Sequence, residues 1–543
     1  MPQPNSAVVA YLCKPRPAMS LLYILSASTL VYLLVKVIAR LKQIRQALEQ
    51  IGYSPGERTV IGFSSALGQV LPPIPYITLG HSHYWYSKYQ IFERLGTDIY
   101  GTASIFPSAS YFTLADPAAI KQVSYTRNNF VKNTAAYKVL EAFGSNLISV
   151  EGELWKRQRR IAAPAFSDNN NYLVWEVAKK FTEQMIHSWG TRQSITVHDV
   201  SEDLALPLSI CVIAEAGLGQ DVSWGNDIVP EGHKLTFKDA LTVVSRTMFL
   251  PLILPNWAWS LKQSWKDAKQ AHAELRLYLH RMIKSRRELK EQKIQDVINQ
   301  KHDLFNQLVF ARDADDMLTE DELIGTACNQ HSSKWHETTA HTLAIILGLL
   351  ALYPDVQDKL SRQLRELQNE HRELTYTHFH QLRYAMAVVY ETLRLFPMAT
   401  VMPKKATSDT IITTGFPPNA RTVRVPASTV VHVCSTGLHY NPSYWESPDE
   451  FDPERFMDPH WNRDAFVPFS LGPRACIGRR FAETALVAEL TALISKYKVS
   501  IDQSRFKFID GETILERRSR LIHPKVGITL TPASYSLVFS PRD

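Results

Sequence analysis

The stretch FSLGPRACIG, residues 469–478, contains the most informative cysteine of the chain. Gly472 lies four residues before Cys476 and Gly478 two residues after it, where a backbone can adopt positive φ or come close to a flat ligand. Arg474 adds a planar guanidinium group suited to a carboxylate. A lone cysteine among apolar residues is usually a small core residue. These neighbours favour a ligand site instead.

Residues 479–497, RRFAETALVAELTALISKY, have the apolar spacing and composition of a helix. Cys476 is therefore expected just before a helix N-terminus. The positive end of the helix dipole and the free N–H groups would favour a thiolate there. A thiolate loop with glycines and an arginine suits a haem, because sulfur can bind the iron and the guanidinium can bind a propionate.

The order Phe469-x-x-Gly472-x-Arg474-x-Cys476-x-Gly478 resembles the haem-binding signature of the cytochrome P-450 superfamily. The resemblance implies a mainly α fold with small β-sheets. It implies that Cys476 binds the iron of haem b. Phe469, Gly472, Arg474 and Gly478 would surround the cofactor.

A second motif, WKRQRRIAAPAF, begins at Trp155. Trp155 and Arg159 are four residues apart and so share a helix face, which by itself is more typical of a surface stacking pair. The motif resembles the family's C helix, in which both residues would donate to haem propionates. The other basic residues of this helix would face solvent: Lys156, Arg157 and Arg160.

Glu391 and Arg394 lie one turn apart in ETLRLFP, where Pro397 ends a helix. Such a pair is usually exposed and weak, but the apolar neighbours favour burial, and a buried pair needs further partners. The resemblance provides Arg455, in the PERF segment, as the third member of a structural group that braces the cysteine loop.

HETTA, residues 336–340, resembles part of the family's long central helix. Glu337 and Thr338 would then be the catalytic acid and alcohol that relay protons, although the same residues also fit a solvated turn. The preceding residues 326–335, TACNQHSSKW, depart from the family pattern, because Lys334 and Trp335 stand where small residues are expected. Trp335 would overpack the site. Impaired oxygen activation and an error in the coding boundary are both consistent with this departure.

Several other stretches carry local signals. Residues 99–114 alternate loosely and predict a hairpin that turns at residues 106–108. Residues 410–433 are rich in Thr and Val and predict small strands. Residues 355–370 resemble a helix of the family, and the charged residues 284–303 indicate a solvated helix face.

Residues 18–35, AMSLLYILSASTLVYLLV, carry no charge and would span roughly 27 Å as a helix, against about 30 Å for a bilayer core. Snorkelling of Lys36 extends the span to residue 38. We expect a single-pass anchor over about 18–38 within a segment 1–45, followed by a catalytic domain over 46–543. A cleaved signal peptide and a buried helix are the alternatives. The basic residues that follow predict a cytosolic body at the endoplasmic reticulum membrane.

The 543 residues are 45% hydrophobic and carry a formal net charge of +7, with no basic runs interleaved with aromatics. This composition argues against nucleic-acid binding. The five cysteines are scattered and lack CxxC spacing. They indicate neither a disulfide framework nor a zinc site, and they fit a reducing compartment.

The resemblance implies a haem-thiolate monooxygenase that inserts one oxygen atom from O2 into a lipophilic small molecule. The sequence has no dinucleotide-binding fingerprint, so the electrons are expected from NADPH-cytochrome P-450 reductase, with cytochrome b5 as a further candidate. Residues 137–147 and 398–401 are the expected substrate contacts. The alternative function is a haem protein of the same fold without oxygen activation, either an isomerase or dehydratase variant or a degenerate copy. A basic face would attract the reductase: Arg157, Arg160, Arg479, Arg480 and either Lys404 or Lys405.

Overall fold

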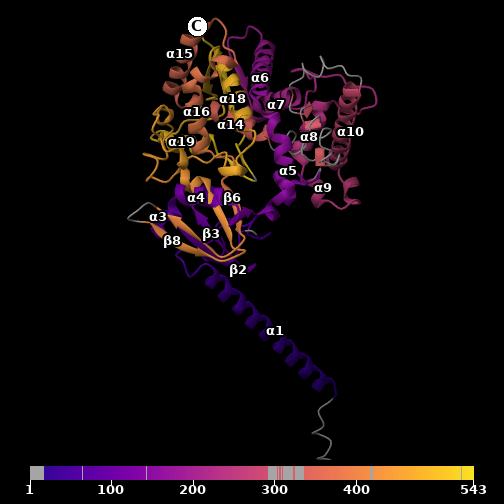
Figure 1. The fold of residues 1–543 in the computed structure, drawn as a ribbon, viewed down its shortest axis with the longest axis vertical. Coiled ribbons are helices and arrows are strands. Elements are labelled where there is room, and N and C mark those ends of the chain that lie inside the picture. Colours follow the sequence, from indigo (N-terminus) through magenta and orange to yellow (C-terminus); the bar gives the residue numbers. More distant parts are fainter. Residues whose placement is uncertain are drawn as a thin grey trace, which may run out of the picture.

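A computed structural model describes residues 17–63, 65–141, 144–291, 303, 305–306, 308–309, 322–324, 335–415, 420–527 and 529–542. Helices make up most of this structure, and strands β2 (Ile99–Phe106), β3 (Ala109–Leu114) and β6 (Val401–Ala406) lie near the end of the body from which α1 (Pro17–Gln50) projects (Figure 1). The predicted mainly α fold with small sheets is therefore observed.

The helices follow the chain in this order: α1, α2 (His83–Ser87), α3 (Gln90–Leu95), α4 (Pro117–Tyr125), α5 (Gly152–Ala162), α6 (Asp168–Trp189), α7 (Leu206–Val212), α8 (Phe237–Thr247), α9 (Leu250–Ile253), α10 (Gln263–Glu291), α14 (Trp335–Leu352), α15 (Pro354–His371), α16 (Arg383–Leu395), α17 (Ser435–His439), α18 (Arg479–Ile494) and α19 (Ile514–Leu521).

The largest sheet has six strands in the order β1-β2-β3-β9-β6-β4. The predicted hairpin forms its antiparallel β2–β3 pair, in which Ile99 pairs with Leu114. A three-stranded sheet has the order β10-β13-β5, and two smaller pairs are β11-β12 and β7-β8. The strand bounds are β1 (Arg58–Ile61), β2 (Ile99–Phe106), β3 (Ala109–Leu114), β4 (Phe130–Lys132), β5 (Ile195–Val197), β6 (Val401–Ala406), β7 (Thr410–Thr414), β8 (Arg421–Val425), β9 (Val430–Cys434), β10 (Tyr497–Ile501), β11 (Lys525–Val526), β12 (Leu530–Thr531) and β13 (Leu537–Pro541).

The core is built around α14, whose second half is apolar on every side and fully buried from Leu343 to Leu350. α7, α16, α18 and β10 pack against it, and α6 packs along α18. The hydroxyl of Tyr535 donates to the carbonyl of Ala344 at 2.6 Å. This bond ties the C-terminal segment to the central helix.

α1 stands away from the body along most of its length (Figure 1), and its residues from Leu25 to Leu41 include many exposed apolar side chains. The helix continues past the predicted boundary at residue 45, because Ala47 and Ile51 are buried where its end packs against β2 and β3. Among the residues that the structure describes, no single helix has the length and hydropathy of a membrane span; α14 and α15 reach them only together, bent by 109°.

One helix boundary differs from the prediction. α18 begins at Arg479 as expected but ends at Ile494, and Tyr497 starts strand β10. In residues 497–501, buried positions alternate with the exposed Lys498 and the half-exposed Ser500, and Tyr497 pairs with Pro541 of β13. Sheet pairing has therefore ended the helical pattern earlier than apolar spacing suggested.

Candidate functional site

The loop before α18 holds Cys476 through backbone contacts. The N–H of Cys476 donates to the carbonyl of Phe469 at 2.8 Å, which closes the loop. Gly472 has φ +70°, and a Cβ there would lie 2.6 Å from the carbonyl oxygen of Ser124. A side chain does not fit at this position. Gly478 is the N-cap of α18 and has an ordinary negative φ. The predicted placement just before the helix is observed.

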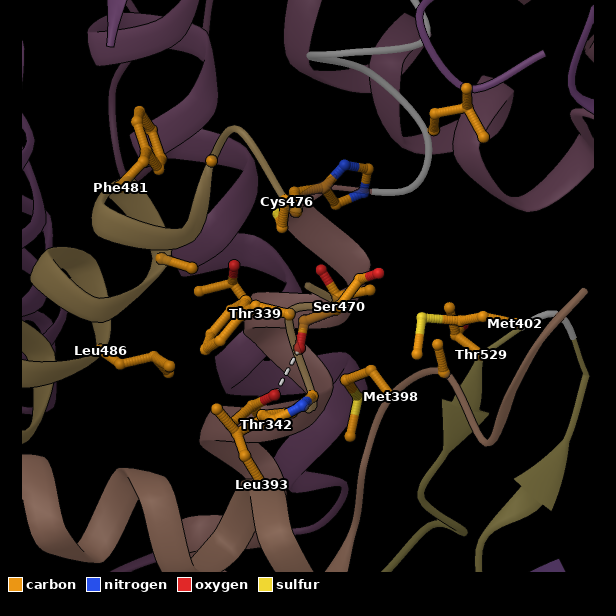
Figure 2. A pocket seen from close by; sticks show the side chains of 18 of the residues that line it. Thr339, Thr342, Leu393, Met398, Met402, Ser470, Cys476, Phe481, Leu486 and Thr529 are labelled. Carbon is orange, nitrogen blue, oxygen red and sulfur yellow. Dashed lines mark hydrogen bonds between the residues drawn. The ribbon is translucent and has the colours of Figure 1, made fainter. Parts of the chain in front are cut away.

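Cys476 opens onto a cavity of about 330 Å³ (Figure 2). Side chains of α14, α16 and α18 converge on this space, and Met398, Met402 and Thr529 lie along another side of it. The walls are mostly apolar. Members of both predicted substrate stretches line it: Tyr137, Leu140, Met398, Ala399 and Val401.

Opposing effects act on the pKa of the Cys476 thiol. Desolvation by the surrounding protein raises this pKa, although the side chain is exposed to the cavity. The Gly478 N–H and the charges of Arg159 and Arg479 oppose this shift but do not offset it. Loss of hydration disfavours the anion more than one helix end stabilises it. A metal cation bound to the sulfur would reverse the balance.

Arg474 and Trp155 meet beside the cysteine loop. The guanidinium of Arg474 lies 4.2 Å from the ring centroid of Trp155 and donates to the carbonyls of Leu147 and Val150 at 3.0 and 2.6 Å. Arg159 donates to the carbonyl of Ala475 at 3.3 Å. Arg474 lines the cavity, whereas Trp155 and Arg159 support the loop from behind that wall.

Two lysines of the cavity wall were not predicted there. Lys132 of β4 and Lys404 of β6 line the cavity with Arg474. Burial first, and the positive charge of Arg474 second, lower the pKa of Lys132 to about 7 and that of Lys404 to about 8. The alternation of β6 turns Lys404 inward and leaves Lys405 exposed. The alternation of side chains along a strand was the signal that one of these two adjacent lysines would point inward.

The predicted basic face needs correction at two positions. Lys404 cannot belong to it, because its side chain is buried in the cavity wall. Arg157 is half-buried and pairs with Glu322 at 2.7 Å, so its charge is already neutralised. Arg479 and Arg480 lie half-exposed at the start of α18 and share Glu483 at 2.7 and 3.6 Å, so the three side chains together keep one net positive charge; Arg160 and Lys405 are exposed.

The first turns of α14 reach the cavity through His336, Thr338, Thr339 and Thr342. Thr342 donates its hydroxyl to the carbonyl of Thr338 at 2.7 Å. Glu337 is half-buried and is not among the lining residues. Residues 326–334, which include Lys334, lie outside the described residues. Trp335 begins α14, and its side chain also lies outside the described part.

The group formed by Glu391, Arg394 and Arg455 is present and buried. Arg394 donates to both carboxylate oxygens of Glu391 at 2.7 and 2.8 Å, and Arg455 reaches Glu391 at 3.2 Å. Arg394 also donates to the carbonyl of His439 at 2.8 Å. The Nε2 of His439 accepts from the N–H of Val467 at 2.9 Å. His439, which sequence reasoning missed, therefore connects this group to the chain entering the cysteine loop.

The family model described as Cytochrome P450 matches residues 90–526. The chain belongs to the cytochrome P450 family. Cytochrome P450 monooxygenase 124 of Postia placenta is 37% identical over 516 residues, which cover 92% of this chain and 96% of that protein. Cytochrome P450 monooxygenase ORF6 of Penicillium roqueforti is 27% identical and covers 83% of each chain. Mouse leukotriene-B4 omega-hydroxylase 3 is 26% identical over 391 residues, which cover 68% of this chain and 72% of that protein.

A cytochrome P450 uses a haem iron with an axial thiolate, and this chain is an oxidoreductase of the monooxygenase type, for which oxygen insertion is the general reaction. The cavity fits a haem. Its wall carries three cations, and the buried Nε of Arg474 has no hydrogen-bond partner among the described residues. A dianionic edge of the cofactor would meet these donors, while the apolar walls would meet its ring.

Proposed function

We propose that this cytochrome P450 inserts one oxygen atom into a lipophilic small molecule at a membrane surface, with electrons from a separate NADPH-dependent reductase. The observation that carries the proposal is the cavity between the Cys476 loop and α14. It combines a sulfur ligand, three basic side chains and a mostly apolar wall in one cavity. Mostly apolar pockets with few polar groups suit lipophilic ligands.

The residues divide the task of holding haem b. Cys476 would bind the iron, and Arg474, Lys132 and Lys404 would bind the carboxylates from the cavity wall. Trp155 and Arg159 hold the arginine and the loop. Phe469 and Gly478 line the same space, and Gly472 permits the turn. When bound, the haem supplies the activation of dioxygen by an iron with a thiolate ligand.

Glu337 and Thr338 are the proposed acid and alcohol. Thr338 lines the cavity, so its hydroxyl can be presented to a reacting group. Glu337, the preceding residue of α14, is half-buried, and we propose it as the acid that supplies the proton. The walls of the cavity are mostly apolar, so proton movement near the reacting group depends on few polar atoms.

Met398, Met402, Leu140 and Ile148 support a lipophilic substrate, because they supply flexible apolar contact area. A mouse relative is named for the omega-hydroxylation of a leukotriene, which is a lipid. The exposed apolar side chains of α1 support attachment to a bilayer, for which we propose the endoplasmic reticulum with the body in the cytosol. Cytochrome b5 is a second proposed electron donor.

The test is turnover of a panel of lipophilic compounds with purified protein, a microsomal NADPH-dependent reductase and isotopically labelled dioxygen. We expect one labelled oxygen atom in a product, and Thr338→Ala should lower product formation relative to NADPH consumption about tenfold. No labelled product from any compound, in protein that retains its haem, would support the isomerase, dehydratase or degenerate alternative. The double variant Lys334→Ala/Trp335→Gly then tests whether the departure before HETTA impairs turnover.

A further inference from the structure

Glu151 places a carboxylate among the cations beside the cysteine loop. Its Oε2 accepts from Arg474 at 2.5 Å and from the backbone N–H of Lys132 at 3.1 Å. Its Oε1 accepts from the N–H of Gly152 at 3.2 Å and lies 3.7 Å from Arg127. One side chain thus contacts the N-terminus of α5, the end of β4 and both arginines.

The two arginines that contact Glu151 also contact Trp155. Arg127 lies 4.3 Å and Arg474 lies 4.2 Å from the ring centroid, distances at which a guanidinium interacts favourably with the indole. Glu151 is the N-cap residue of α5, and Trp155 follows it in the first turn of that helix. The tryptophan is buried. The position of Trp155 therefore depends on the guanidinium groups of Arg127 and Arg474 that cover its ring.

Without a counter-ion, this arrangement would be unfavourable. Arg127, Arg474 and Lys404 carry like charges within one partly buried region. Burial lowers the pKa of Lys404, and the positive charges of Arg474 and Arg127 lower it further. Glu151 opposes that repulsion, and Arg474 is the attraction that holds the pKa of Glu151 below its ordinary value against the cost of burial. The carboxylate can therefore keep Arg474 in place while the buried Nε of this arginine has no hydrogen-bond partner among the described residues.

We propose that Glu151 and Arg127 are positioning residues that hold Trp155 and Arg474 for the anionic edge of the cofactor and set the local electric field there. This inference rests on the proposed haem site. Neither residue lines the cavity, so both act through Arg474 and Trp155. By holding the backbone of Lys132, Glu151 also fixes the strand that carries a second cation of the wall.

The test is the reduction potential of the haem protein in three single variants. Glu151→Gln keeps the shape and an acceptor oxygen but removes a negative charge, so the reduced state should become more favourable. Arg127→Gln removes a positive charge, so the reduced state should become less favourable. Each should change the ratio of reduced to oxidised protein at a fixed potential by about threefold or more, in opposite directions. Glu153→Gln is the matched control, because Glu153 is 86% exposed on the same helix.

Glu151→Asp keeps the charge and should remain close to the parent protein in potential. If the substitutions only loosened the fold, the reduction potentials of Glu151→Gln and Arg127→Gln would shift in the same direction. That result, or no shift of the potential in either variant, would overturn the assignment. A parent protein that binds no haem would instead refute the proposed haem site, so the two failures are distinguishable.

Discussion

Glu489 is a buried carboxyl group of the cavity wall, on the third turn of α18. It is fully buried, and neither carboxyl oxygen has a hydrogen-bond partner among the described residues. Burial raises its pKa to about 8. A carboxyl group in an unfolded chain titrates near 4.3. Between these values the folded protein binds a proton that the unfolded chain does not, so stability falls as pH rises from about 4.3 to 8.

Glu489→Gln should therefore stabilise the haem protein more at pH 8 than at pH 5, by up to about 4 kcal/mol of difference. Thermal unfolding midpoints at the two pH values provide the measurement. Glu446→Gln is the control, because Glu446 is exposed and should show no such difference. An equal effect of Glu489→Gln at both pH values would mean that the carboxyl is ionised in the folded state.

Individual residues differ in how far sequence could place them. Cys476, Arg474 and Gly472 follow from one short motif whose spacing is fixed by a tight loop. Lys404 was misplaced because a lysine is ordinarily exposed, and only the pairing of β6 with β9 settles which of two adjacent lysines points inward. Glu151 carried no signal, because its partners Arg127 and Arg474 lie far away in the sequence.

At the scale of elements, α16 is anchored to the segment before the cysteine loop through Arg394. This fully buried guanidinium donates to Glu391 and to the backbone carbonyls of His439, Pro448 and Glu450. A lysine cannot reproduce this fork of donors. Breaking a buried pair while leaving its partner charged typically costs 3 to 5 kcal/mol.

Arg394→Lys should accordingly lower the free energy of unfolding by about 3 kcal/mol or more and reduce the yield of haem protein. Arg424→Lys is the matched control, because Arg424 pairs with Asp409 on the surface with both side chains more than half exposed. That variant should stay within about 1 kcal/mol of the parent. Unfolding measurements that give the same small loss for both would contradict a bracing role.

The residues at which helices and strands begin and end were harder to predict from the sequence than the presence of these helices and strands. The helix after Cys476, the hairpin of β2 and β3 and the helix α15 all formed near their expected residues. The predicted helix 479–497 includes Tyr497, the first residue of β10, because the alternation of this strand becomes decisive only when β13 pairs with it. Likewise, the last turn of α1 joins the body because β2 and β3 bury it, a contact with no local signal.

For the whole molecule, the distribution of charge bears on electron supply. Arg479 and Arg480 lie half-exposed at the start of α18, immediately after the cysteine loop. A partner that docks there would approach the sulfur side of the cavity. Exposed charges of this kind act over about 8 to 10 Å at moderate ionic strength.

Arg480→Glu should slow reduction by the NADPH-dependent reductase several-fold at low salt, with haem content unchanged, because it reverses a charge on the docking face. The difference from the parent should shrink as salt is added. Arg424→Glu, on β8 of the small sheet pair, is the control and should leave the rate unaltered. Stopped-flow reduction rates that are equal for Arg480→Glu and the parent at low salt would place the docking surface elsewhere.

Cys476 as the thiolate ligand of haem is the central claim, and the carbon monoxide spectrum of the reduced protein tests it most directly. The parent protein should show the red-shifted Soret band of thiolate ligation. Cys476→Ala should lose that band, whereas Cys434→Ala should keep it, because Cys434 is buried in β9 away from the cavity. A parent spectrum typical of histidine ligation, or an unchanged band in Cys476→Ala, would contradict the account.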